Sequence, residues 1–216
     1  MIIIKKRGLL LSLLLFFGGS IMAKKDNLST YRKKRNFNVT TEPSGARRKV
    51  TKKPIFVIQK HEASHLHFDL RLAIDNVLVS WAVPKGPSNN PATKRLAIMT
   101  ENHPMDYAKF EGMIPEGNYG GGAVMVWDKG TYTNIKKVDG TLLPMDECLK
   151  IGRIEISFKG KKLKGNYALV RTQRGGGKQW LLIKMNDAYA RKKIGSLGPM
   201  AKSALSGKTM KEIRKG

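Results

Sequence analysis

Short stretches of apolar, β-branched and aromatic residues recur through the middle of the chain, separated by Gly, Pro, Asn and Asp. Such stretches predict strands, here over residues 54–59, 65–72, 77–83, 95–100, 123–127, 153–158, 162–172 and 180–185. Strands do not alternate with long helical patterns in this sequence, which argues against a doubly wound fold. About eight short strands within about 130 residues predict a mainly β fold, a closed or nearly closed antiparallel barrel.

The connections support this organisation. Asp75-Asn76 predicts a tight hairpin turn, and the Gly-rich stretch 174–178 predicts a flexible hairpin loop. Helical patterns occur only near the C-terminus, over 187–193 and 209–214. The expected parts are a signal-like or upstream extension (1–21), a basic, extended N-terminal arm (22–53), the barrel (54–186) and a basic tail with short helices (187–216).

The predicted strand 65–72 carries the clearest chemical signal. Its residues alternate strictly between polar and apolar, so His65, His67, Asp69 and Arg71 share one face of an extended strand. His67 and Asp69 can then reach one metal ion, and a guanidinium one step further can hold an anion bidentately. A solvated strand face is the alternative interpretation. Clustering favours a metal or phosphate site, because three of the four histidines lie within 61–67.

The charge of the chain indicates a polyanionic partner. Lys and Arg number 41 against 16 Asp and Glu, which gives a formal net charge of +25 and a pI of about 10.3. Such an excess attracts polyanions through counterion release. The charge is spread along the whole chain, which favours nucleic acid over a membrane surface or a merely soluble basic protein. Cys148 is the single cysteine, so an intramolecular disulfide and a CxxC zinc site are excluded.

Residues 1–21 have two interpretations. A basic start followed by a short apolar run and small residues resembles a secretory signal, and the run is too short to span a bilayer comfortably. The alternative is a mis-called start upstream of Met22, since Met22-Ala23-Lys24-Lys25 is typical of a cytosolic N-terminus. We favour the second interpretation, which predicts a cytoplasmic protein without stable membrane association. Secretion is the alternative.

Several motifs, in order from residue 28 to residue 185, resemble the 3′-phosphoesterase domain of bacterial and archaeal ligase D, the end-healing module of non-homologous end joining. They read QKHEASHLHFDLRL, SWAVPKGPS, KRLAI, ENHPMDYAKFEGMIPEGNYG, VMVWDKG, LKGNYALVR and WLLIK. Because the match extends over nearly the whole predicted barrel, it is much more specific than a single pattern.

The resemblance implies roles for individual residues. It assigns a metal, usually manganese and with other divalent transition metals possible, to His61, His67 and Asp69. It assigns contacts with the scissile phosphate to Arg71 and His103. General acid is the alternative role for His103, because an unperturbed imidazole has a pKa near neutrality. Further positions around the phosphate match Lys85, Arg95, Glu101 and Tyr107.

The chain departs from the family pattern at two places. The family's N-terminal arm contributes an Arg-Asp-Phe stretch and a later glutamate, where this chain has Arg35-Asn36-Phe37 and Glu42. Asn36 therefore replaces the family's aspartate, which puts the contribution of the arm in doubt. His65 stands where the family often has arginine, and it is expected to contact solvent or nucleic acid.

The resemblance implies a metal-dependent enzyme that removes 3′-terminal ribonucleosides and then 3′-phosphates at primer–template ends of DNA or DNA/RNA. DNA ligase, a repair polymerase and Ku are the corresponding protein partners. The alternatives are a non-catalytic nucleic-acid-binding barrel and, if residues 1–21 form a signal, a secreted metal-dependent hydrolase.

Two short patterns suggest other chemistry, and both are interpreted as coincidences. Lys137-Val138-Asp139-Gly140 matches the KxDG pattern of covalent nucleotidyl transferases, but the chain is too short for a ligase domain beside the barrel. The stretch 175–178 ends in Gly-Lys, but a predicted strand follows it, and a P-loop requires a helix and a GK[ST] ending.

Overall fold

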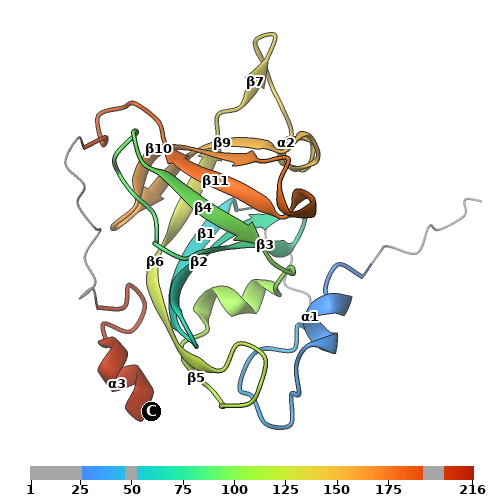
Figure 1. The fold of residues 1–216 in the computed structure, drawn as a ribbon, viewed down its shortest axis with the longest axis vertical. Coiled ribbons are helices and arrows are strands. Elements are labelled where there is room, and N and C mark those ends of the chain that lie inside the picture. The colour runs from blue at the N-terminus through green and yellow to red at the C-terminus, as the bar shows by residue number, and fades with distance from the viewer. Residues whose placement is uncertain (1–25, 47–52, 192–201) are drawn as a thin grey trace, which may run out of the picture.

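A closed eight-stranded antiparallel barrel forms the body of the protein (Figure 1), as the sequence predicts. The computed structural model describes residues 26–46, 53–191 and 202–216. The strand order is β1-β2-β3-β4-β11-β10-β9-β6, and a further pairing of β1 with β6 closes the barrel. The additional strand β5 pairs with β6, and β7 and β8 form a separate hairpin.

The barrel strands are β1 (Ile55–Glu62), β2 (Leu66–Ile74), β3 (Val77–Val83), β4 (Lys94–Met99), β6 (Gly122–Asn134), β9 (Arg153–Gly160), β10 (Lys164–Arg171) and β11 (Gln179–Lys184). The shorter strands are β5 (Gly112–Ile114), β7 (Lys137–Val138) and β8 (Thr141–Leu142). The helices are α1 (Ser29–Lys33), α2 (Met145–Ile151) and α3 (Met210–Lys215), with 3-10 turns η1 (Met105–Lys109) and η2 (Gly175–Gly177).

Alternation along the strands produces two apolar layers. Leu70, Leu72 and Trp81 point into the barrel, where they join Trp127 and Trp180 in the main core. The opposite faces of β3 and β6 contribute Leu78 and Val124 to a second core outside the barrel. The other buried members of the second core are Tyr31 from α1, Met105 and Tyr107 from η1, Phe110 just after η1, and Ile114 from β5. One sheet therefore supports a packed interior and a covered outer face.

Two predicted connections are confirmed. Asp75 and Asn76 have φ of 49° and 63° and join β2 to β3 directly, the left-handed geometry that a two-residue hairpin turn requires. Residues 174–178 connect β10 to β11 and include η2. The predicted helix at 209–214 is also confirmed as α3, which begins with a capping box between Thr209 and Glu212.

Other expectations need correction. Helix is not confined to the C-terminal region, because α1 and α2 lie elsewhere; at five and seven residues they are too short for a helical period to be visible. Residues 187–191 are not helical, because the Asp187 carboxylate accepts hydrogen bonds from nearby backbone amides and bends this segment; residues 192–193 lie outside the described residues. β5, β7 and β8 were not predicted from the sequence.

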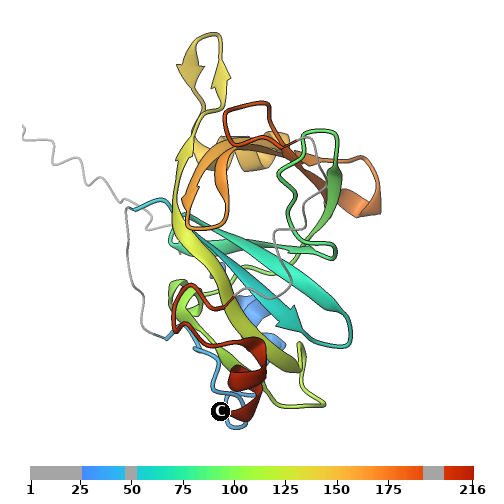
Figure 2. The same ribbon diagram turned by 90° about the vertical axis from the view of Figure 1, so that its left-hand side faces the viewer.

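The N-terminal arm is not simply extended. In its described part, 26–46, Tyr31 is fully buried and its hydroxyl donates to the Pro43 carbonyl at 2.7 Å. Phe37 packs against the same second core. Two aromatic residues therefore anchor a segment whose composition is otherwise polar, and Figure 2 shows α1 against the lower part of the molecule, beyond the barrel.

Candidate active site

The candidate site lies on the outer face of β1, β2 and β3. The β1–β2 hairpin places His61 directly opposite His67, and Gln59 opposite Asp69. The β2–β3 pairing places Arg71 opposite Ser80. Directly opposed residues have Cβ atoms about 5 Å apart, so the ladder of backbone hydrogen bonds brings these polar side chains together.

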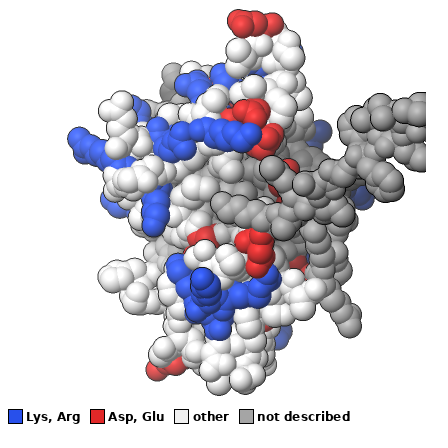
Figure 3. Space-filling view, turned by 90° about the vertical axis from the view of Figure 1, so that its right-hand side faces the viewer, with Lys and Arg blue, Asp and Glu red and all other residues white. Residues whose placement is uncertain are grey.

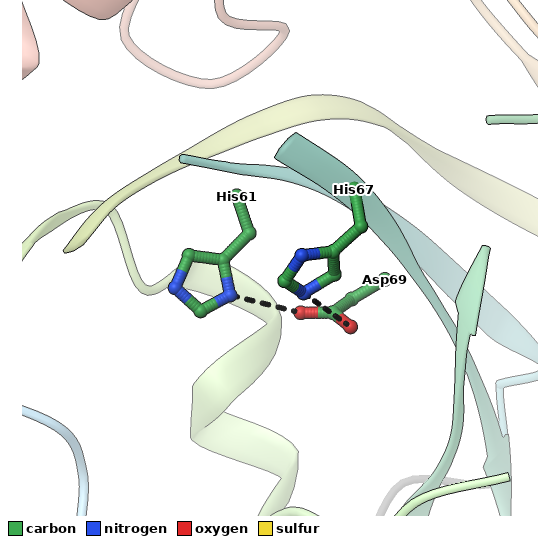
Figure 4. A group of neighbouring side chains, drawn as sticks. All are labelled: His61, His67 and Asp69. Carbon is green, nitrogen blue, oxygen red and sulfur yellow. Dashed lines mark ion pairs between the residues drawn. The ribbon is translucent and has the colours of Figure 1, made fainter. Parts of the chain in front are cut away.

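His61, His67 and Asp69 form a compact group (Figure 4). The Nδ1 atom of His61 and the Nε2 atom of His67 each lie 3.6 Å from a carboxylate oxygen of Asp69. One ligand atom from each residue lies within 4.8 Å of the other two. This is the one group of potential metal ligands found among the described residues.

The hydrogen bonds of the two imidazoles test whether a cation fits this group. The Nε2–H of His61 donates to the Gly120 carbonyl at 2.8 Å, and the Nδ1–H of His67 donates to the His65 carbonyl at 2.9 Å. A carbonyl only accepts, so in the neutral rings the other nitrogen of each histidine carries a lone pair. Both lone pairs face the Asp69 carboxylate. Carbonyl partners that fix the tautomer in this way are typical of metal-binding histidines, so the donor set fits a divalent cation.

Asp69 is held as a carboxylate. Burial alone raises its pKa, but the adjacent Arg71 guanidinium outweighs burial and lowers the pKa of Asp69 to about 2. The residue is 6% exposed. A buried carboxylate that stays ionised supplies the negative charge that a cation requires.

Arg71 is fixed by three hydrogen bonds. Its Nε donates to Gln59 at 2.7 Å, and its two terminal nitrogens donate to Ser80 at 3.0 Å and to Asp69 at 3.0 Å. Its guanidinium also lies over the Tyr107 ring, 4.7 Å from the centroid. A guanidinium has five N–H groups, so two remain after these three bonds. Because Arg71 is buried and lines the cleft, these two N–H groups can bind an anion.

Arg35 from the arm connects the rest of the cluster. It donates from Nε to Glu42 at 2.9 Å and from one terminal nitrogen to Glu101 at 3.0 Å. Its other terminal nitrogen lies 3.1 Å from His103 Nε2. Tyr107 donates its hydroxyl to the same Glu42 at 2.8 Å. Both carboxylates and the Arg35 side chain are at most 4% exposed, so this is a buried, mutually satisfied ionic network.

His103 is held in one tautomer. Its Nδ1–H donates to the Glu101 carbonyl at 2.9 Å, which leaves Nε2 as an acceptor for Arg35. Burial, with the nearby charges of Arg71 and Arg35, lowers the pKa of His103 well below its usual value. His103 is therefore neutral at pH 7 and bound at both nitrogens.

Glu101 closes the network toward solvent. It accepts from the Lys34 ammonium at 3.0 Å, and the Tyr119 hydroxyl lies 3.1 Å from the same ammonium. Burial raises the pKa of Glu101, but hydrogen bonds from Lys34 and Arg35 outweigh it and lower the pKa. Tyr119 is about half exposed at the rim.

These residues enclose a cleft of about 270 Å³. Of the site residues predicted from the sequence, the structure brings the following to this cleft: Arg35, His61, His67, Asp69, Arg71, Glu101, His103 and Tyr107. Glu42 lies directly behind them, bound to Arg35 and Tyr107.

The structure does not bring three predicted residues to the cleft lining. Lys85 is exposed in the turn after β3, without a hydrogen bond or ion pair to any described residue. Arg95 pairs with the inward-facing Leu182, on the barrel-interior side of β4, and its Nε is buried without a partner among the described atoms. Asn36 is exposed, and its side chain accepts the Asn38 amide at 3.2 Å.

The expectation that His65 shares the strand face is wrong. β2 begins at Leu66, and His65 is exposed in the preceding turn. The strand therefore begins at Leu66, one residue later than the polar pattern predicts. What His65 contributes is its backbone carbonyl, which fixes the His67 ring.

Sequence reasoning missed several supporting residues. Gln59 accepts from Arg71 and donates to the carbonyls of Tyr107 and Phe110. It lies two residues before His61, so strand periodicity identifies it as facing the site. The carbonyl of Gly120 and the hydroxyl of Ser80 have no comparable signal, because their contributions depend on the tertiary fold.

The two misleading patterns lie away from the cleft. Lys137 to Gly140 forms the exposed β7–β8 hairpin, and residues 175–177 form η2 before a strand. Within the described part of the chain, no helix combines the length and the apolar character needed to cross a membrane. The signal-like residues 1–21 lie outside the described residues.

Comparison with known proteins agrees with the resemblance found in the sequence motifs. A family model described as the DNA Ligase D 3′-phosphoesterase domain matches residues 59–171. The multifunctional non-homologous end joining protein LigD of Pseudomonas aeruginosa is 46% identical over 176 residues, covering 79% of this chain and 20% of that protein. LigD of Mycobacterium tuberculosis is 40% identical over 178 residues, covering 81% of this chain and 22% of that protein.

LigD of Mycolicibacterium smegmatis is 43% identical over 164 residues, with 75% of this chain and 21% of that protein covered. The chain therefore spans about a fifth of the length of these relatives.

Proposed function

Since the chain belongs to the DNA ligase D 3′-phosphoesterase domain family, we propose that it hydrolyses phosphate esters at the 3′ ends of nucleic acid strands. The substrates are primer–template ends that carry a 3′-terminal ribonucleoside or a 3′-phosphate, and the product is a 3′-hydroxyl. The observation that carries this proposal is the convergence of three open metal-ligand atoms beside a buried arginine with two spare N–H groups.

His61 through Nδ1, His67 through Nε2 and Asp69 through its carboxylate would hold one divalent transition metal. Imidazole and carboxylate together suit such ions, and we assign manganese. When bound, the metal supplies Lewis-acid polarisation of the phosphate and stabilises charge in the transition state.

The protein's own residues bind and orient the phosphate. Arg71 lines the cleft and has two N–H groups left to bind the phosphate, while Gln59, Ser80 and Asp69 prevent the guanidinium from turning away. Donors held in place before the reaction stabilise developing negative charge without reorganising. Arg35, kept in position by Glu42, Glu101 and His103, adds a second fixed cation to the cleft.

His103 acts as a positioning residue in this mechanism. Its lowered pKa and its acceptor role toward Arg35 disfavour the alternative of a general acid, which would need a proton on Nε2. A neutral His103 instead orients Arg35 at the wall of the cleft.

The surface charge supports a nucleic acid substrate. On the face that includes α1, clusters of Lys and Arg side chains lie above and below a region with Asp and Glu (Figure 3). Together with the net charge of +25, these clusters favour contacts between this face and the phosphates of a nucleic acid strand. We place the activity in the repair of DNA ends by non-homologous end joining, in the cytoplasm, with a DNA ligase, a repair polymerase and Ku as partners.

An assay on primer–template DNA tests the proposal. One substrate carries a 3′-phosphate and the other a 3′-terminal ribonucleoside, and the enzyme is treated with EDTA before Mn²⁺, Mg²⁺ or Zn²⁺ is added. We expect hydrolysis of both ends to stop in EDTA and to return best with Mn²⁺. Full activity in EDTA would refute the metal assignment, and no hydrolysis with any ion would refute the function.

A further inference from the structure

A second basic surface lies away from the active-site cleft. A hollow of about 310 Å³ is lined by Lys161, Lys162, Lys164, Tyr189 and Arg191, among others, and no Asp or Glu is among its described lining residues. We call it the Tyr189 surface. It shares no described lining residue with the active-site cleft. The segment after β11 that carries Tyr189 runs along the side of the barrel opposite α1 (Figures 1 and 2).

Tyr189 is held in place by a neighbouring ion pair. The Asp187 carboxylate accepts from the Lys184 ammonium at 2.5 Å and from the Asn166 amide at 2.5 Å, and its other oxygen accepts the Tyr189 amide at 2.8 Å. The Lys184 side chain is fully buried. A buried cation is retained only with good partners, so Asp187 fixes this segment firmly to the end of the barrel.

The Tyr189 ring is nevertheless open to solvent. Gly165 has φ of +81°, and a Cβ atom on it would lie 2.8 Å from Cδ2 of Tyr189, so the ring packs closely against this backbone. The residue is still 50% exposed. The chain therefore presents a fixed aromatic ring with one side supported and the other side accessible.

The cations around the ring form no ion pair with a described residue, although the buried Asp128 carboxylate lies near Lys162. The side chains of Lys161 and Lys164 form no hydrogen bond or ion pair with described residues. Arg191 donates only to the carbonyls of Ala188 and Ala190, at 3.3 and 3.0 Å, and Lys162 donates only to carbonyls. The active-site cleft differs, because there Arg35 and Arg71 are paired with carboxylates.

We propose that the Tyr189 surface binds a single-stranded stretch of nucleic acid, with one base stacked on Tyr189 and phosphates against Lys161, Lys164 and Arg191. A supported aromatic ring surrounded by unpaired cations is the combination that binds unstacked bases. In a duplex the bases are stacked on each other and unavailable to the ring. This inference rests on the proposed function in one respect: the strand is the template segment that continues beyond a recessed primer end.

Binding of fluorescein-labelled oligothymidylate with a 3′-hydroxyl, followed by anisotropy in EDTA, tests the surface without any catalytic step. Tyr189→Ala should weaken binding about 10-fold, because stacking of one base is lost. Tyr189→Phe keeps the ring and should bind as the unaltered protein does. If Tyr189→Ala binds as tightly as the unaltered protein, or if Tyr189→Phe weakens binding as much as Tyr189→Ala, stacking is refuted.

The cations are tested by charge-matched double variants. Lys161→Ala/Lys164→Ala should reduce the slope of log K against log salt by about 1.4, the value for two phosphate contacts with a single strand. Lys137→Ala/Lys211→Ala removes the same charge from exposed positions elsewhere and should leave that slope nearly unchanged. Equal changes in the two double variants would show a general charge effect and overturn the site.

A blunt duplex in the same assay separates strand types. Tyr189→Ala should weaken binding of the single strand and not of the duplex, and equal weakening would assign the surface to duplex phosphates instead. Circular dichroism confirms that each variant is folded. Oligothymidylate binding through Tyr189 by a protein without 3′-end hydrolysis would refute the proposed function alone, and hydrolysis without such binding would refute this inference alone.

Discussion

The two halves of the active-site cleft are constructed differently. On the strand half, His61, His67 and Asp69 are positioned by the register of β1 and β2, and their ligand atoms have lone pairs that face one another. On the arm half, Arg35 is positioned by ion pairs with Glu42 and Glu101, and the polar atoms are already satisfied. The strand half is thus fixed by backbone and open to a ligand, whereas the arm half is fixed by side chains and closed.

This difference indicates that the strand half carries the chemistry and that the arm half holds the site in place. The lone pairs of His61 and His67 face the Asp69 carboxylate with no hydrogen-bond donor between them, an arrangement that a divalent cation would satisfy. Buried ion pairs such as Arg35–Glu42 offset their desolvation only while both partners remain. We therefore expect changes in the strand half to affect turnover most, and changes in the arm half to affect stability and orientation.

The largest effect should come from removing a metal ligand. Asp69→Ala, His61→Ala and His67→Ala should each reduce 3′-phosphate hydrolysis by about 1,000-fold or more, because the Lewis acid contributes several kcal/mol to the barrier. His65→Ala is the matched control, since the side chain is exposed and only its carbonyl contacts His67. Initial rates with saturating Mn²⁺ provide the measurement. If His65→Ala loses as much activity as His67→Ala, the ligand set has been assigned wrongly.

The next effect concerns the geometry of the phosphate contact. Arg71→Lys keeps one positive charge but cannot donate to Gln59, Ser80 and Asp69 while also presenting two N–H groups. We expect kcat to fall about 100-fold, the loss typical of one preorganised donor, while manganese binding by calorimetry persists. Arg153→Lys, at a half-exposed arginine of β9, controls for the substitution itself. Unchanged kcat in Arg71→Lys would place Arg71 outside the catalytic contact.

The barrel and the strand half were predictable because they depend on local periodicity. The alternation from Leu66 to Leu72 places core residues on one face of β2 and site residues on the other. Asp75-Asn76 then fixes the hairpin turn that follows. The hairpin turn that brings His61 opposite His67 was not predictable from alternation, because it depends on where β2 begins.

The arm half was harder to predict from the sequence. Arg35 reaches Glu101 across 66 positions in the chain, and no local pattern encodes a contact between side chains so far apart. Tyr31 is a single buried aromatic within a polar segment, so the burial of the arm had no periodic signal. Resemblance to a family identified Glu42, Glu101 and Tyr107, but not the network that joins them.

The arm half should respond to pH through His103. Its pKa is lowered in the folded protein by burial and by Arg71 and Arg35, so the unfolded chain binds the proton more readily. The stability that the neutral imidazole contributes is therefore complete above the unfolded value of 6.5 and is lost as pH falls below it. When the pH falls from 7.5 to 5.5, the free energy of unfolding of the metal-free protein should decrease by up to about 1.4 kcal/mol more than that of the His103→Gln variant.

Urea denaturation of both proteins at the two pH values provides this measurement. His61 and His67 are present in both proteins, so the difference between the proteins isolates His103. Equal losses of unfolding free energy in the two proteins would mean that His103 is not held neutral by its surroundings.

The smallest effect is expected at Asn36, where the chain departs from the family's aspartate. Asn36 is exposed, outside the lining of the cleft, and its side-chain oxygen accepts the Asn38 amide at 3.2 Å. An aspartate oxygen can accept the same hydrogen bond, and surface substitutions of this kind change free energies by about 0.5 kcal/mol or less. Asn36→Asp should therefore keep ribonucleoside removal and 3′-phosphate removal within about twofold of the unaltered enzyme. Parallel assays on the two substrates decide the point: faster ribonucleoside removal alone would show that the exposed end of the arm reaches the substrate, and that Asn36 tunes this enzyme toward 3′-phosphates.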